Sequence, residues 1–143
     1  MRVYVDADAC PVTDITVNWA VRQGLDIILI CDSAHEMQRA GARTITVHRG
    51  DDSADYVIVN LLSSGDLVIT QDYGLAAMCL ARGARAINQD GRAYTKDNID
   101  GLLAIRHLAR AARRAGERTK GSKKRVKEQD AAFLRALEGF AAP

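Results

Sequence analysis

Short strand-like runs alternate along the chain with segments of helical periodicity. In the segments between the runs, apolar residues recur three and four positions apart, as they do from Val12 to Ala20. Apolar strands alternating with amphipathic helices are typical of a parallel sheet covered by helices on both faces. We therefore predict a three-layer α/β/α fold with a mostly parallel five-stranded sheet. The expected strands are residues 2–5, 27–31, 44–48, 67–70 and 84–87.

The length of 143 residues suits one domain with a substantial core, which we expect to occupy residues 1–143. Residues 90–92 are expected to form a turn. A basic, glycine-containing loop is predicted at about residues 116–127, followed by a C-terminal helix over 128–138. The other predicted helices lie between Pro11 and Gly24, over 33–40, from Ala54 onwards, before Gly83, and from a cap at Asp97 or Asn98 to about Ala115.

The charges are unevenly distributed although the net charge is only +2. Residues 1–72 contain 11 acidic and 5 basic residues, whereas residues 73–143 contain 7 acidic and 15 basic ones. Residues 106–127 alone hold 10 of the 20 basic residues and a single acid. This asymmetry indicates metal chemistry beside a contact with a polyanion. A solvated helix and tail is the alternative interpretation of the basic segment.

Several classes of protein are disfavoured. No apolar run approaches the roughly 20 residues that span a bilayer, and the first residues lack the pattern of a signal peptide. The three cysteines are odd in number and have no CxxC spacing, which argues against a disulfide framework or a zinc site. We expect a cytoplasmic protein without membrane partners, and the oligomeric state stays open.

Two carboxylates, Asp6 and Asp8, end the first predicted strand two positions apart. Residues two apart in a strand point to the same face, and like charges there are costly unless a cation or a proton offsets them. Carboxylate oxygens suit Mg²⁺ or Mn²⁺. The alternative for Asp8 is a turn or a helix cap. Cys10 precedes the first helix, but no histidine is near it in sequence, so a packing role is favoured over a catalytic one.

Further carboxylates follow two other strands. Asp72 comes two residues after the strand over 67–70, where it could share a cation with Asp6 or cap the next helix. The acids Asp51, Asp52 and Asp55 follow the third strand, and three acids in five residues exceed what helix capping needs. One of them would complete a four-acid site for metal-assisted phosphodiester hydrolysis. Thr70 could support that site or contact a nucleotide.

The basic residues of the second half could follow a phosphate backbone with little sequence specificity. Few aromatic residues lie among them, which makes base stacking improbable. The predicted nucleic-acid contacts, besides Thr70, are Arg106, Arg110, Arg113, Arg114, Lys123, Lys124 and Arg125.

Four motifs resemble the bacterial YaiI/YqxD family: residues 5–11 (VDADACP), residues 52–55, the GDLVITQD segment at 65–72, and GRAYT at 91–95 with Asn98 and Ile99. The resemblance extends over nearly the whole chain and implies a PIN-like domain. It also implies that Asp6 and Asp72 match the acids of metal-dependent ribonucleases, with Asp8 as an additional acid. Asp52 or Asp55 would be the helix acid. The segment 121–125 departs from the Gly/Pro-rich turn of the family, because it is more basic and has no proline.

Three functions follow. The first is a nuclease that uses Mg²⁺ or Mn²⁺ on Asp6, Asp8, Asp52, Asp55 and Asp72 to hydrolyse RNA or another phosphodiester. The second is a phosphatase of the haloacid-dehalogenase type, suggested by the Asp6–Asp8 pair and a GDxxxD-like stretch at 50–55, although no lysine occurs before Asp55 to hold phosphate. The third is a nucleic-acid-binding protein without turnover.

Overall fold

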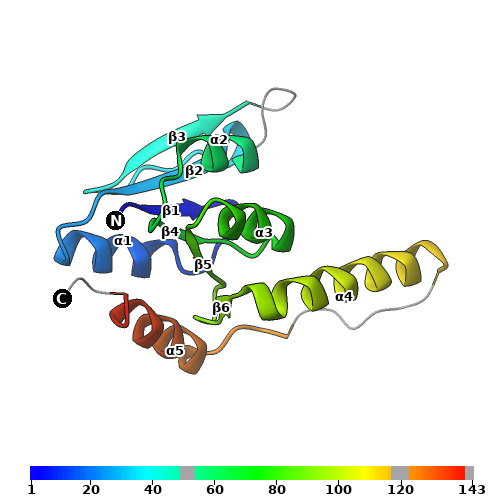
Figure 1. Cartoon of the computed structure of the whole chain (residues 1–143). Helices are drawn as coiled ribbons and strands as arrows, with labels where there is room; N and C mark the ends of the chain where they lie inside the picture. Colours follow the sequence, from blue (N-terminus) through cyan, green and yellow to red (C-terminus); the bar gives the residue numbers. More distant parts are fainter. Residues whose placement is uncertain (49–53, 117–122, 141–143) are drawn as a thin grey trace.

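The computed structural model describes residues 1–48, 54–116 and 123–140. In this part of the chain, six strands form one sheet in the order β3-β2-β1-β4-β5-β6 (Figure 1). All neighbouring strands are parallel except β5 and β6, which are antiparallel. The predicted mostly parallel α/β fold is confirmed, with one more strand than expected. The strands are β1 (Val3–Asp6), β2 (Ile27–Asp32), β3 (Arg43–Val47), β4 (Leu67–Ile69), β5 (Arg85–Ile87) and β6 (Ala93–Tyr94).

Helices cover both faces of the sheet. The first face carries α1 (Thr13–Arg22) and α5 (Lys127–Glu138). The second face carries α2 (Ala54–Leu61), α3 (Tyr73–Ala81) and α4 (Lys96–Arg114). The alternating side chains of β1 show the division, because Val3 and Val5 join the core under α1 and α5, whereas Tyr4 joins the core under α2 and α3. None of the helices in the described ranges is long and apolar enough to span a bilayer.

Two local predictions are wrong. The helix expected over 33–40 is a single 3₁₀ turn, Ser33–His35, in which the Asp32 carboxylate caps the amide of Ala34. The segment that follows has no apolar stripe to bury, and a short helix without packing is unstable. The cap of α4 is Thr95 rather than Asp97 or Asn98. Thr95 and Asn98 form a capping box, with Thr95 Oγ1 accepting from the Asn98 amide at 3.2 Å.

The parallel register brings the acidic motifs to one edge of the sheet. Val5 pairs with Ile69 across β1 and β4, so the next residues of the two segments, Asp6 and Thr70, are neighbours. Because β1 to β4 are parallel, their carboxyl ends open at the same edge, where α2 and α3 begin. The fold thereby collects residues from three separate motifs of the sequence.

Candidate active site at the strand ends

Asp6 is the last residue of β1 and is only partly exposed. Its Oδ2 accepts a hydrogen bond of 2.9 Å from the Thr70 hydroxyl. Burial raises the pKa of Asp6 and the hydrogen bond from Thr70 lowers it, while the carboxylates of Asp55, Asp72 and Asp8 add smaller upward shifts; together these effects bring the pKa to about 6. Asp6 therefore keeps its negative charge at neutral pH at a cost that a nearby cation would relieve.

Thr70 connects Asp6 with the segment that carries Asp72. Its Oγ1 accepts a hydrogen bond from the Asp72 amide at 3.0 Å, so its single hydroxyl proton is the one donated to Asp6. The Tyr94 hydroxyl donates to the Thr70 carbonyl oxygen at 3.0 Å. Thr70 is 1% exposed, and this burial excludes it from direct contact with a nucleotide. Of its two predicted roles, support of the acids agrees with the structure.

Asp72 precedes α3 and caps it, as the alternative interpretation held. Its Oδ1 accepts from the amides of Gly74 at 2.8 Å and Leu75 at 3.2 Å, and also from Arg106 Nη1 at 3.1 Å. In the described part of the chain, every hydrogen bond to this carboxylate goes to Oδ1. Capping thus fixes the orientation of Asp72 and leaves Oδ2 for another ligand.

Asp55 lies in the first turn of α2, which covers the same face of the sheet as α3 and α4. Together with Asp6 and Asp72 it makes a group of three carboxylates. Burial raises the pKa of Asp55, the Asp72 carboxylate raises it further, and Arg106 lowers it. We call Asp6, Asp55 and Asp72 the acid cluster. Asp51 and Asp52, the other candidates for the helix acid, lie outside the described residues.

Asp8 lies past the end of β1, in a turn, and is directed toward β2. Both of its carboxylate oxygens are 3.1 Å from the amide nitrogen of Asp32, which donates to them. The expectation that Asp6 and Asp8 share one face of a strand is therefore wrong, because the strand ends at Asp6. Asp8 does not cap α1 either, since α1 has no side-chain cap.

Two residues that the sequence analysis missed lie beside Asp8. His35 Nδ1 is 2.8 Å from Asp32 Oδ1 and 3.9 Å from Asp8 Oδ1. The His35 hydrogen bond lowers the pKa of Asp32. Within the described ranges, Asp8, Asp32 and His35 are the one group of three whose ligand atoms all lie within 4.8 Å of one another. Asp6, Asp55 and Asp72 are not as tightly gathered. The position of Asp32 at the end of a buried strand was the available signal.

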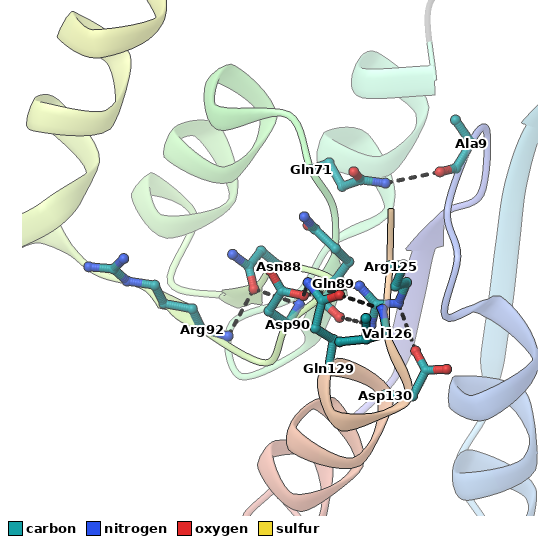
Figure 2. Close-up of polar contacts among 10 residues, drawn as sticks. All are labelled: Ala9, Gln71, Asn88, Gln89, Asp90, Arg92, Arg125, Val126, Gln129 and Asp130. Carbon is teal, nitrogen blue, oxygen red and sulfur yellow. Dashed lines mark hydrogen bonds and ion pairs between the residues drawn. The ribbon is translucent and has the colours of Figure 1, made fainter. Parts of the chain in front are cut away.

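The loop between Asp8 and the first helix contains a strained residue. Ala9 has a φ of 58°, and left-handed backbone costs a non-glycine residue roughly 1 kcal/mol. The side-chain amide of Gln71, one residue before Asp72, donates to the Ala9 carbonyl oxygen at 3.0 Å (Figure 2). This bond joins the loop after β1 to the loop after β4. Strain of this kind clusters at functional sites.

Arg125 has a structural role that its basic character does not reveal. Its guanidinium donates to Asp130 Oδ1 at 2.7 Å, to Asp90 Oδ1 at 3.0 Å and to the Gln89 carbonyl oxygen at 2.7 Å (Figure 2). We call this group the Arg125 latch, because it joins the start of α5 to the turn between β5 and β6. All three guanidinium nitrogens are occupied, which corrects the prediction that Arg125 contacts phosphate.

The remaining candidates differ in accessibility. Arg106 is paired with Asp72 and one-third exposed. The other predicted phosphate contacts are exposed: Arg110, Arg113, Arg114, Lys123 and Lys124. Cys10 packs against the core, and burial raises the pKa of its thiol, which is the opposite of what an activated nucleophile needs.

The donor set fits a hard divalent cation. The acid cluster offers carboxylate oxygens from three residues, and two of these residues, Asp6 and Asp55, have raised pKa values. Among the described residues, the one salt bridge of the cluster joins Asp72 to Arg106. Mg²⁺ and Mn²⁺ take such oxygens and retain several waters, so one or two direct carboxylate ligands suffice and other acids can contact the ion through its waters. The excess negative charge is the structural observation in favour of a metal.

Comparison with known proteins places the chain in a family. A sequence model described as "Uncharacterized BCR, YaiI/YqxD family" matches residues 4–142. A UPF0178 protein of Exiguobacterium sibiricum is 52% identical over 133 residues, which cover 93% of this chain and 91% of the relative. One from Ruminiclostridium cellulolyticum is 48% identical over 143 residues, covering 100% and 94%.

Among solved structures, Rae1 (YacP) from Bacillus subtilis, a W164L mutant, is similar with a TM-score of 0.47 and 14% identity. The match covers 94% of this chain and 91% of that one. A likeness at this level carries no argument about activity.

Proposed function

The chain belongs to the YaiI/YqxD family, and from the arrangement of its own residues we propose that it is a divalent-metal-dependent nuclease with a PIN-like domain. The substrate is RNA or another phosphodiester. One observation supports this proposal above the others. Asp6 and Asp72 follow different strands, and Thr70 is hydrogen-bonded to both residues. Arg106 pairs with Asp72, and the charges of Asp72 and Arg106 shift the pKa of Asp55.

Each residue of the site has its own role in the proposed function. Asp6, Asp55 and Asp72 hold Mg²⁺ or Mn²⁺, with Asp52 as a further candidate and Asp8 on the adjoining side toward β2. When bound, such an ion polarises a phosphate oxygen and lowers the pKa of a coordinated water. Asp72 presents Oδ2 because its Oδ1 is engaged by α3 and Arg106. Thr70 holds Oδ2 of Asp6 as an acceptor, which leaves Oδ1 for the ion.

The phosphatase alternative has weaker support from the geometry. That chemistry needs the second aspartate of the pair as a mobile acid beside the nucleophile. Both oxygens of Asp8 instead accept from the Asp32 amide, which holds Asp8 against β2. Binding of nucleic acid without turnover is the alternative that the experiment must separate.

The test is cleavage of a fluorescently labelled single-stranded RNA with Mn²⁺ present. We expect wild type to cleave and Asp6→Asn to lose at least about 100-fold in rate, the scale of a lost group in proton transfer or ion binding. The asparagine keeps a carbonyl oxygen for Thr70. Asp14→Asn is the matched control, because Asp14 is an exposed carboxylate on α1 paired with Arg39. RNA binding without Mn²⁺-dependent cleavage by wild type would contradict the proposal in favour of a binding protein.

A further inference from the structure

The C-terminal half of α4 is an unusually basic surface. From residue 101 to residue 114 the helix contains four arginines and no acidic residue. At 100° per residue these arginines fall within about 100° of the helix circumference, so they form one row. Helix α4 packs mainly against α3, and its C-terminal half projects outward beyond the rest of the described fold (Figure 1). The row consists of Arg106, Arg110, Arg113 and Arg114.

Arg106 joins this row to the acid cluster. Its Nη1 is 3.1 Å from Asp72 Oδ1. A Cβ at Gly74 would lie 3.9 and 4.0 Å from the two terminal guanidinium nitrogens, so Arg106 lies against the first turn of α3. The next three members, Arg110, Arg113 and Arg114, are exposed, and no described carboxylate forms a salt bridge with them. The row therefore begins at the acids and continues outward with uncompensated positive charge.

We propose that this row binds the backbone of a single-stranded nucleic acid whose phosphodiester reaches the acid cluster, with Arg106 at the junction. The choice of ligand rests on the proposed function. The eight residue steps from Arg106 to Arg114 rise about 12 Å, which corresponds to about three or four stacked nucleotides at 3.4 Å each. The strand thus follows α4 for that length before it enters the site.

A single strand fits this geometry better than a duplex. Asp6 is recessed at the end of β1, so a strand that follows the row of about 12 Å on α4 must then turn sharply to reach it. A duplex is stiff over about 150 base pairs and cannot bend on that scale without a large penalty. The exposed apolar residues Ile105 and Leu108, 63% and 67% exposed, lie outside the sector of the arginines. They offer a separate surface, and self-association through it is an outcome of the test.

The experiment is fluorescence anisotropy of a labelled 12-nucleotide single-stranded RNA, in EDTA so that nothing is cleaved. We expect Arg110→Ala/Arg113→Ala to weaken binding at least about 10-fold and to reduce the slope of log K against log salt by about 1.4, since each single-strand phosphate contact contributes about 0.7. The matched control is Arg22→Ala/Arg82→Ala, which removes two exposed arginines near the ends of α1 and α3, at the opposite edge of the sheet.

The possible results separate this inference from the proposed function. Weaker binding in the α4 variant alone supports the inference, even if wild type shows no Mn²⁺-dependent cleavage, a result that would contradict only the proposed function. Equal losses in both double variants contradict the inference, even if cleavage is observed. Equal affinity of wild type for a 12-base-pair RNA duplex also contradicts it. So does sedimentation showing that the α4 variant changes the oligomeric state and leaves RNA affinity unchanged.

Discussion

Two groups of aspartates and arginine lie at the same edge of the sheet, and they are balanced differently. In the Arg125 latch, one arginine with a 22% exposed side chain faces Asp90 and Asp130 and also meets a carbonyl oxygen, so every guanidinium nitrogen has a partner. The acid cluster has three carboxylates, and among the described residues only Asp72 forms a salt bridge, with Arg106. The latch is a completed structural contact, whereas the cluster retains excess negative charge.

This difference separates a structural ion pair from a functional one. Arginine–carboxylate forks of good geometry fix the parts that they join. Like charges gathered at a recessed site destabilise the fold, and they persist where function requires them. Two groups built from aspartates and one arginine therefore predict opposite responses to substitution.

The largest expected effect is on the latch. Arg125→Ala removes three hydrogen bonds made by a charged guanidinium and releases α5 from the turn after β5, so we expect the free energy of unfolding to fall by about 3 kcal/mol, even though Asp90 and Asp130 are partly exposed. Arg106→Ala removes a more exposed pair and should cost less than about 1 kcal/mol. Urea denaturation of the two variants beside wild type measures both. Equal losses of unfolding free energy in Arg125→Ala and Arg106→Ala would contradict the distinction between the latch and the acid cluster.

The second prediction is that removing the Asp6 charge stabilises the protein at neutral pH. Because the pKa of Asp6 is about 6 in the folded protein and 3.8 in the reference state, the folded protein binds more protons between these values. Wild-type stability therefore falls as pH rises from about 4 to about 6, by on the order of 2 kcal/mol, and stays lower above pH 6. Asp6→Asn should abolish this fall and be more stable than wild type at pH 7.

The matched control for this prediction is Asp90→Asn, which removes a carboxylate that Arg125 and Gln129 already contact. It should destabilise the protein at pH 7. Thermal denaturation across pH 4 to 8 distinguishes the two variants. A destabilised Asp6→Asn at pH 7 would mean that the Asp6 charge is satisfied within the fold and would remove the distinction between the two regions.

The fold was largely predictable because its signal is local. The buried strands β2 and β4 are continuous apolar runs, and the parallel pairing of β1 with β4 then brings Asp6 and Thr70 together. Strand β6 has two residues and depends on pairing with β5, so no periodicity reveals it. The expected helix after β2 is wrong because residues 33–40 lack an apolar stripe, and Met37 is the one described residue of the segment that packs against the core.

The site was predictable only in part, because the orientation of several of its side chains depends on contacts with residues far away in the sequence. Asp6 and Asp72 follow from their positions after strands. Asp8 contacts the amide of Asp32, 24 residues away, and the neighbouring Ala9 is left-handed; the residue types indicate neither feature. Arg125 was assigned to phosphate from its basic neighbours, whereas its partner Asp90 lies 35 residues away.

The central claim is that the acid cluster holds a divalent cation, and isothermal titration calorimetry with MnCl₂ tests it most directly. Wild type, Asp6→Asn and Asp90→Asn are compared in the same buffer at pH 7. We expect wild type and Asp90→Asn to bind Mn²⁺ with similar affinity, and Asp6→Asn to bind at least about 10-fold more weakly, which is a loss of about 1.4 kcal/mol. Absence of binding by wild type, or equal affinity in Asp6→Asn, would contradict the claim.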